Sequence, residues 1–364
     1  RDKLNYAPDT NHLEHTPIKY VRLNFHIMNS SDSSRNFGEE EGVKFVRELL
    51  KYAHKSLENN EKMFLPPGND TPVLPTRYRY VLTPRPDDPH DDGIYFHYDD
   101  ELYFYVVRGK HRNNFRREVV RKYGVQLDTV LNVFLMPHHP DSVASPTYGA
   151  YGAGIALGNA VKITGCYEIG TPPWGIRGTF NHEIGHIFGL RHTWSGDDGC
   201  ADTPNHPGCW SRTPDPPCDS LASNNLMDHN AWQNAWTPCQ IATIHYNMAR
   251  ERTRVRKLLL PRWCELHDDQ HIVVRDSVHW KSMKDLEGHL TVAEGGVLRI
   301  SCRVSLPRGA RITVQPGGKL ILDNCRLHNA CGDTWQGIFV QKRGKREGQV
   351  VVVGNPRLEN LHPG

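Results

Sequence analysis

Hydrophobic and polar residues follow one another along the first half of the chain in patterns that predict alternating strands and helices. Residues 18–28, "IKYVRLNFHIM", are rich in β-branched and aromatic side chains, which predicts a strand. Residues 38–59 begin with glutamates and then carry apolar residues at helical spacing, which predicts a helix; these are Phe45, Leu49, Leu50, Ala53 and Leu57.

Three further segments extend this alternation. Residues 77–83 predict a strand, and residues 115–124 predict a helix that ends at Gly124. Residues 130–136, "VLNVFLM", form a short apolar run typical of a strand buried on both faces. We therefore expect a mixed or mostly parallel twisted sheet with helices packed on it, an α/β (α+β) fold class.

Two loop-like stretches interrupt this pattern. Residues 84–101 contain six aspartates and predict a solvated loop, with a calcium site as the alternative. Residues 148–165 are rich in glycine and predict an irregular or edge strand that another chain can approach closely. Residues 238–260 predict one long helix.

The pattern of the sequence changes near residues 259–275, after which short strand-like segments repeat. The segment "TVAEGGVLRI" (291–300) recurs 22 residues later as "TVQPGGKLIL" (313–322), with a Gly-Gly pair and a leucine in the same places. Short strands at a fixed period predict stacked rungs of a β-solenoid, with a sandwich of hairpins as the alternative. We expect a first domain over 1–260 and an all-β repeat region over 261–364.

Composition and charge indicate a globular protein without a strong excess of either charge. Of the 364 residues, 38% are hydrophobic and 23% are charged, and the formal net charge is +3. This balance predicts no nucleic-acid partner. No stretch approaches the roughly 20 apolar residues that cross a membrane, so we expect no membrane span. The sequence does not indicate an oligomeric state.

Cysteines cluster in a Pro- and Gly-rich part of the chain, at Cys200, Cys209, Cys218 and Cys239. This pattern indicates a disulfide framework, and with it a secreted or cell-surface location; a zinc ribbon is the alternative, but close C-x-x-C pairs are absent. The pairing of the other cysteines is left open; these are Cys166, Cys264, Cys302, Cys325 and Cys331.

The segment "TFNHEIGHIFGLRHTW" (179–194) places ionisable side chains in an apolar helix. His182 and His186, four residues apart, lie on one helical face, while Glu183 points aside to where it reaches a metal-bound water. Gly189 permits a turn that brings His192 round as a third nitrogen ligand. Three imidazoles and one open position favour zinc. The alternative is a core helix whose histidines bond to backbone carbonyls.

The pattern His-Glu-x-x-His-x-x-Gly-x-x-His resembles that of the metzincin zinc metallopeptidases. Together with "GCADTP" and "NNLMDH" it is similar to the pappalysin family, in particular its secreted bacterial members, over residues 18–260. The resemblance implies an upper part to about residue 192 and a lower part over about 193–260. It also implies a methionine turn at Met227 beneath the metal.

The resemblance further implies roles for several individual residues. Relatives often carry a tyrosine two residues after this methionine, where the chain has His229. We expect His229 to serve as a donor to the transition state when protonated; the alternatives are a zinc ligand or a side chain that is simply exposed. The family pairing implies disulfides Cys200–Cys218 and Cys209–Cys239. Relatives hold calcium where this chain has Asp198, Asp202 and Thr203.

The resemblance also implies how a substrate binds. An edge strand above the zinc helix pairs with the extended substrate, and here this is the segment that starts at Tyr148 and Gly149. The pocket wall after the methionine turn contains Trp232 and Trp236, for which core packing is the alternative.

We therefore predict a secreted zinc endopeptidase. A zinc-bound water loses its proton to Glu183, attacks a peptide carbonyl, and Glu183 protonates the departing amine. Calcium is a structural cofactor in this prediction, and the partner is a protein or peptide substrate. Two alternatives are a secreted adhesion or scaffold protein with a structural zinc site, and a zinc hydrolase of a non-peptide amide such as a cell-wall crosslink. Glu183 argues against the scaffold, because a structural zinc site has no use for it.

Overall fold

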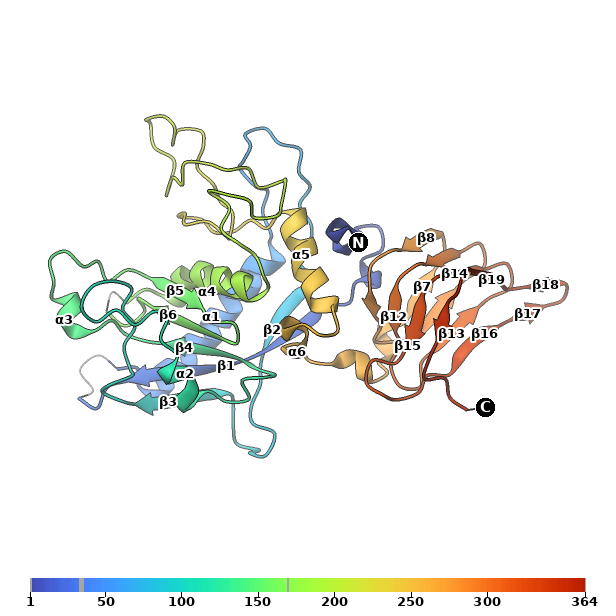
Figure 1. Cartoon of the computed structure of the whole chain (residues 1–364), viewed down its shortest axis with the longest axis horizontal. Coiled ribbons are helices and arrows are strands. Elements are labelled where there is room, and N and C mark those ends of the chain that lie inside the picture. Colours follow the sequence, from blue (N-terminus) through green and yellow to red (C-terminus); the bar gives the residue numbers. More distant parts are fainter. Residues whose placement is uncertain (1, 33–35, 169, 364) are drawn as a thin grey trace. The chain divides into compact units, whose positions relative to one another are not determined.

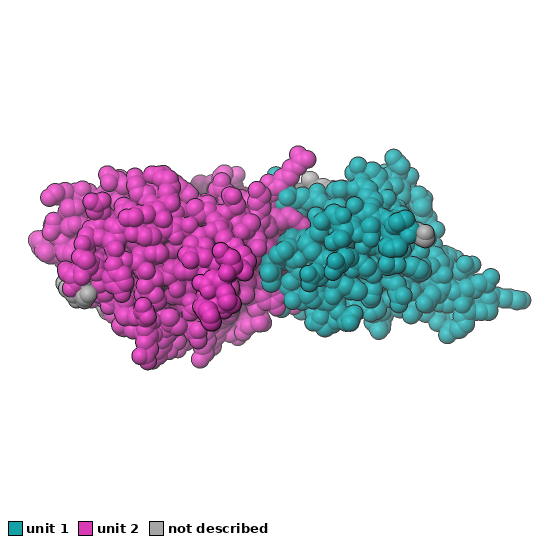
Figure 2. Space-filling model, turned by 90° about the horizontal axis from the view of Figure 1, so that it is seen from below, with its two compact units in different colours: residues 1–18, 249–251, 260–364 teal, residues 19–248, 252–259 magenta. Residues whose placement is uncertain are grey.

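The computed structural model describes residues 2–32, 36–168 and 170–363. The chain forms two compact units, which Figure 2 shows in different colours. The first, here called the α/β unit, comprises Lys19–Met248 and Arg252–Leu259. The second, here called the β unit, comprises the residues up to Ile18, Ala249–Glu251 and the chain from Leu260 onward.

The α/β unit is built around one six-stranded sheet (Figure 1). Its strands are β1 Lys19–Asn29, β2 Tyr78–Leu82, β3 Ile94–Tyr98, β4 Leu131–Leu135, β5 Ala153–Ala156 and β6 Ala160–Thr164. The helices in this part of the chain are α1 Glu39–Glu58, α2 Glu118–Tyr123, α3 Pro140–Val143, α4 Pro173–Ile187, α5 Pro238–Ala249 and α6 Arg254–Lys257.

The strand order is β2-β1-β4-β6-β5, and β3 also pairs with β1. Every pairing is parallel except that of β5, which runs antiparallel to β6 and lies at the edge of the sheet. The mixed, mostly parallel sheet is the one the sequence predicts, with β5 as the edge strand.

Both faces of the sheet are covered, which explains why β1 and β4 are almost entirely buried. On one face Phe25 stacks on Phe180 of α4, with ring centroids 5.9 Å apart. Figure 1 shows α1 beside α4 on this face. On the other face Met28 and Phe134 pack in one apolar cluster with Val120 of α2.

Three sequence predictions differ from the structure. The aspartate-rich stretch contains a strand, β3, and Asp91 within it accepts bonds from Arg85 N, Gly93 N and the Tyr95 hydroxyl. Helix α2 is shorter than predicted. The long helix expected over 238–260 is two helices, α5 and α6. The second helix starts anew because Thr253 caps its first turn: Thr253 Oγ1 accepts the Arg256 N–H at 3.2 Å and donates to Asn247 O at 2.7 Å.

The β unit contains three parallel sheets of four strands, visited in turn by the chain. These strands are β7 Ile272–Val274, β8 Ser277–Trp280, β9 Lys284–Asp285, β10 Leu290–Val292, β11 Val297–Ile300, β12 Arg303–Ser305, β13 Arg311–Val314, β14 Lys319–Asp323, β15 Arg326–His328, β16 Gly337–Val340, β19 Gln349–Val353 and β20 Arg357–Leu358. A small antiparallel hairpin, β17 Lys342–Arg343 with β18 Arg346–Glu347, interrupts the series.

The repeat found in the sequence is a repeat in space. Leu298 lies directly opposite Leu320, and Thr291 opposite Thr313, in parallel register. Parallel pairing excludes hairpins between these strands. Gly295 and Gly317 adopt left-handed φ angles of 82° and 84°, which explains the glycine at this turn in both copies. The inward side chains of the three sheets form one apolar core.

Candidate functional site

Helix α4 and the turn after it gather the predicted metal ligands. His182 and His186 lie one helical turn apart, and His182 is 3% exposed. Gly189 follows with φ +93°, a left-handed angle that favours glycine, and it directs the chain towards His192. The Leu190 N–H closes this turn on Gly185 O at 3.0 Å.

The three imidazoles converge on one point. The Nε2 atoms of His182 and His186 are 3.2 Å apart, and the His192 Nε2 lies 3.2 Å and 3.0 Å from them. Zinc–nitrogen bonds of about 2.0–2.1 Å in a tetrahedron place nitrogens roughly 3.3–3.4 Å apart. The spacing therefore fits a tetrahedral metal centre.

In His182 and His186 the Nδ1 atom donates a hydrogen bond to a carbonyl, which indicates that the converging Nε2 atom is unprotonated and carries a lone pair. His182 Nδ1 donates to Leu226 O at 2.7 Å, and His186 Nδ1 donates to Leu190 O at 2.9 Å. Burial, helped by the neighbouring imidazoles, lowers the pKa of His182 to about 3 and that of His192 to about 4, so the rings are neutral. Two bare lone pairs pointed at each other repel, and a cation between them removes this repulsion.

Glu183 lies beside this cluster, between α4 and strand β5. Its side chain is buried, and it accepts a bond from the backbone N–H of Ala156. Burial raises the pKa of this carboxyl to about 8, and a cation held by the three histidines would lower it again and favour the ionised form that accepts a proton. Gly154 of β5 lies against it: a Cβ there would come 2.5 Å from Glu183 Cγ. The absence of a side chain at Gly154 thus makes room for the carboxylate.

Met227 is fully buried under α4. A Cβ at Gly185 would lie 2.5 Å from Met227 Sδ, so the helix and the methionine are in close contact between the two helical histidines. Leu226 supplies the carbonyl that orients His182. Asn225 Oδ1 accepts the Met227 N–H at 2.8 Å and in turn bonds to Gln240.

His229 lies at the rim of the histidine cluster. One of its ring nitrogens is within 4.8 Å of ligand nitrogens of His182 and His192, and its ring centroid is 4.8 Å from that of Trp194. Its neighbour Asp228, which no sequence motif singled out, is 1% exposed and bonds to Thr193 Oγ1 and, at 2.9 Å, to His206 Nε2. Asp228 thereby fastens the segment carrying His229 to the chain after His192.

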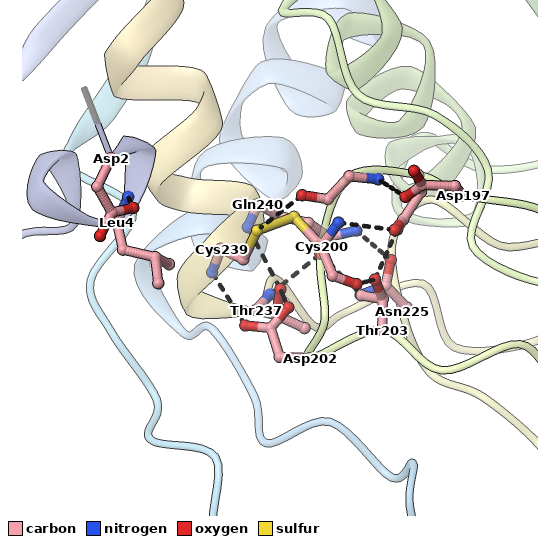
Figure 3. Close-up of a disulfide and its surroundings, with 12 residues drawn as sticks. Asp2, Leu4, Asp197, Cys200, Asp202, Thr203, Asn225, Thr237, Cys239 and Gln240 are labelled. Atoms are coloured by element: carbon pink, nitrogen blue, oxygen red, sulfur yellow. Dashed lines mark hydrogen bonds between the residues drawn. A yellow bond between two sulfur atoms is a disulfide. The ribbon is translucent and has the colours of Figure 1, made fainter.

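The disulfides of this region are paired differently from the prediction. The structure joins Cys200 to Cys239 and Cys209 to Cys218, with Cα atoms 5.6 Å apart in each pair. The predicted pairs Cys200–Cys218 and Cys209–Cys239 are therefore wrong. The reason is local: Asp202 accepts the Cys239 N–H at 3.0 Å and the Thr237 hydroxyl at 2.7 Å, holding the start of α5 against Cys200 (Figure 3). A third disulfide joins Cys264 to Cys331 in the β unit.

The residues predicted to bind calcium lie around the Cys200–Cys239 disulfide. Asp198 accepts the Thr203 hydroxyl at 2.6 Å and the Cys200 N–H at 2.9 Å. Asp202 is bonded as described above, so both carboxylates serve donors of the chain. Calcium at this place stays a prediction.

The predicted substrate residues fall into two groups. Trp236 is 2% exposed, and its ring lies 2.9 Å from a Cβ built on Gly185, so it packs in the core beneath α4. Trp232 is half-buried and meets Phe64 edge to face. Tyr148 and Gly149 precede β5, and the Tyr148 hydroxyl bonds to His138 Nδ1 at 2.7 Å.

Comparisons with known proteins give a limited result. No model of a known protein family matches the chain, and no curated protein matches it. Among solved structures, mature mirolysin of Tannerella forsythia in complex with a cleaved peptide matches with 18% identity and a TM-score of 0.43, over 66% of this chain and 94% of that one. Mirolysin in complex with compound 9 matches with 18% identity and a TM-score of 0.46, over 66% and 96%.

Proposed function

We propose that the protein is a zinc-dependent endopeptidase of the metzincin kind, similar to the pappalysins. The observation that carries the proposal is the convergence of three imidazole nitrogens at 3.0–3.2 Å, beside a buried carboxylate that does not belong to the cluster. A structural zinc site needs ligands only, whereas a hydrolytic site needs a base next to them. His182, His186 and His192 would hold the metal.

The bound metal would supply a Lewis acid that polarises the peptide carbonyl and makes water acidic. The residues of the chain do the remaining work. Glu183 takes the proton of the attacking water and gives it to the departing amine, as a general base and then a general acid. The Ala156 N–H and the space over Gly154 fix the position of its carboxylate. His229, at the rim, donates a hydrogen bond to the oxyanion.

The substrate would bind along β5. This strand pairs with β6 on one side and is the last strand of the sheet, so within the described residues its other edge pairs with no strand. An extended peptide adds to such an edge by backbone hydrogen bonds. Because Gly154 of β5 touches Glu183, a peptide paired there lies next to the base.

The proposal also includes an extracellular location and a β-solenoid fold of the β unit. The three disulfides in the described residues support an extracellular protein, and no helix of the described chain is long and apolar enough to cross a membrane. The in-register stacking of the repeats in the β unit supports a β-solenoid.

The test is the substitution Glu183→Gln. It should keep the bound zinc and lose turnover of a peptide library by about 10²–10⁴-fold, because the amide cannot take a proton. Glu40→Gln, at an exposed position of α1, is the matched control and should keep both the bound zinc and the turnover. Peptidase activity retained by Glu183→Gln, or a wild-type protein that binds no zinc, would end the proposal.

A further inference from the structure

A loop of the α/β unit carries a concentration of positive charge that the proposed chemistry does not use. Residues 108–117, "RGKHRNNFRR", contain no acidic residue, although the chain as a whole is nearly neutral. Four of its cations have exposed side chains; these are Arg108, Lys110, Arg112 and Arg116. We call residues 108–117 the basic loop.

These four cations lack acidic partners within the described part of the chain. Arg112 donates to Asn114 Oδ1 at 3.1 Å, and Arg108 donates to Thr147 O at 3.3 Å. Cations on solvated protein surfaces are usually interspersed with carboxylates. Two neighbouring carboxylates have other partners: Asp141 pairs with His111 of the loop at 3.1 Å, and Glu118 lies 3.7 Å from Arg121.

A buried cation fixes the loop from beneath. Lys162 of β6 is 1% exposed, and its ammonium group donates to the carbonyls of Asn113, Asn114 and Arg116, the first at 3.0 Å. Within the described residues it has no ion pair. These bonds hold the backbone of residues 113–116 in place, which lowers the entropy cost of binding an anion at this part of the loop.

The basic loop borders two hollows. The first, of about 210 Å³, is lined by the cations Lys110, Arg112, Arg116 and Lys162 and also by Glu101 and Glu118. The second, of about 330 Å³, extends from Arg108 and Lys110 to Tyr148. Tyr148 begins the segment that leads into β5.

Hydrogen bonds place the basic loop beside β5. The loop follows the carboxyl end of β3, and the Tyr105 N–H just before it donates to Pro137 O, beyond the carboxyl end of β4, at 2.8 Å. The Tyr105 hydroxyl donates to Gly154 O at 3.3 Å, and Arg117, at the end of the loop, donates to Asn159 Oδ1 in the β5–β6 turn at 2.7 Å. The basic loop and the residue Tyr105 just before it therefore contact β5 and the turn that follows β5.

We propose that the basic loop is an exosite for a carboxylate-rich segment of the protein substrate, next to the stretch of substrate that lies along β5. This rests on the proposed function. Guanidinium groups match carboxylates with paired hydrogen bonds, and several together select acidic chains. The predicted substrates are proteins with an acidic stretch beside the cleaved bond.

Two peptides test the proposal in the full chain. They share one cleavable core, and one carries a flanking run of aspartates and glutamates where the other has glycine and serine. At low ionic strength wild type should cleave the acidic peptide roughly fivefold to twentyfold faster in kcat/KM, as expected for a few exposed ion pairs, and salt should remove the difference. Arg112→Ala with Arg116→Ala should bring this ratio close to one. Lys44→Ala with Arg47→Ala, which removes the same charge from exposed positions of α1, should keep it.

A binding measurement separates this proposal from the peptidase proposal. Labelled hexaglutamate should bind wild type at least about fivefold tighter than the Arg112→Ala, Arg116→Ala protein, by fluorescence anisotropy. If neither peptide is cleaved, the peptidase proposal fails while this measurement still decides the exosite. Equal binding of hexaglutamate to the wild type and to the double variant overturns the exosite. Binding of a heparin oligosaccharide at the loop, without binding of hexaglutamate, also overturns it.

Discussion

The substitution Gly154→Ala tests the placement of the base by steric pressure alone. An alanine Cβ at this position in β5 would lie 2.5 Å from Glu183 Cγ, 2.8 Å from Oε1 and 2.9 Å from Cδ. Gly154 is not among the glycines with a positive φ, so alanine suits the backbone. The effect of the substitution therefore falls on the Glu183 side chain.

The size of the effect follows from these distances. Non-bonded carbon atoms prefer separations of about 3.5–4.0 Å, so Glu183 must move by about 1 Å. A displacement of this size in a catalytic group costs about 10²-fold in rate, and loss of general-base catalysis sets a limit of about 10⁴-fold. Overpacking costs about 1–3 kcal/mol of stability, which a domain of this size tolerates.

The assay compares kcat and zinc content in three proteins. Gly154→Ala should lose about 10²-fold in kcat and keep its zinc, because the atoms nearest to the new Cβ all belong to Glu183 and none to the three histidines. Gly152→Ala is the control: there the nearest atom to a Cβ is Ile176 Cδ1, at 3.6 Å, and kcat should hardly change. A Gly154→Ala protein with kcat within about threefold of wild type would refute the reasoning, since Glu183 would then lie elsewhere or have another role.

Three further predictions concern the surroundings of the site. Non-reducing peptide mapping should find Cys200 linked to Cys239. Replacing this pair by serines should lower the free energy of unfolding by roughly 4 kcal/mol, and replacing Cys209–Cys218 should lower it by roughly 2.5 kcal/mol. The difference arises because the two disulfides join residues 39 and 9 positions apart, and the longer loop loses more entropy on closure. His229→Phe should lower kcat by about 10²-fold with little change in KM and zinc content, and an unchanged kcat would remove this residue from the mechanism. Burial lowers the pKa of His26 to about 3 and that of His97 to about 4, from 6.5 in the unfolded chain, so the unfolded state binds more protons between these values. Stability should be complete above about pH 6.5 and fall as the pH drops towards 4, and a thermal midpoint that is flat over this range would contradict the assignment.

Much of the fold followed from local pattern. The apolar run at 130–136 became β4, the helical stripe that starts at Phe45 became α1, and the 22-residue repeat became the register in which Leu298 faces Leu320. These predictions held because periodicity reflects which faces of an element are buried. The strand at Ile94–Tyr98 was missed, because its side chains are only partly buried and aspartates surround it.

The three histidines and the base could be identified from the amino-acid sequence, because one helical turn and a glycine bend fix their relative directions whatever the rest of the chain does. Other features depend on the three-dimensional fold: which cysteines pair, that Gly154 lies against Glu183, that Asp228 joins Thr193 to His206, and that the basic loop lies beside β5. Each of these brings together residues that are distant along the chain. Their contact depends on the path of loops and on packing in three dimensions, which local propensity does not encode.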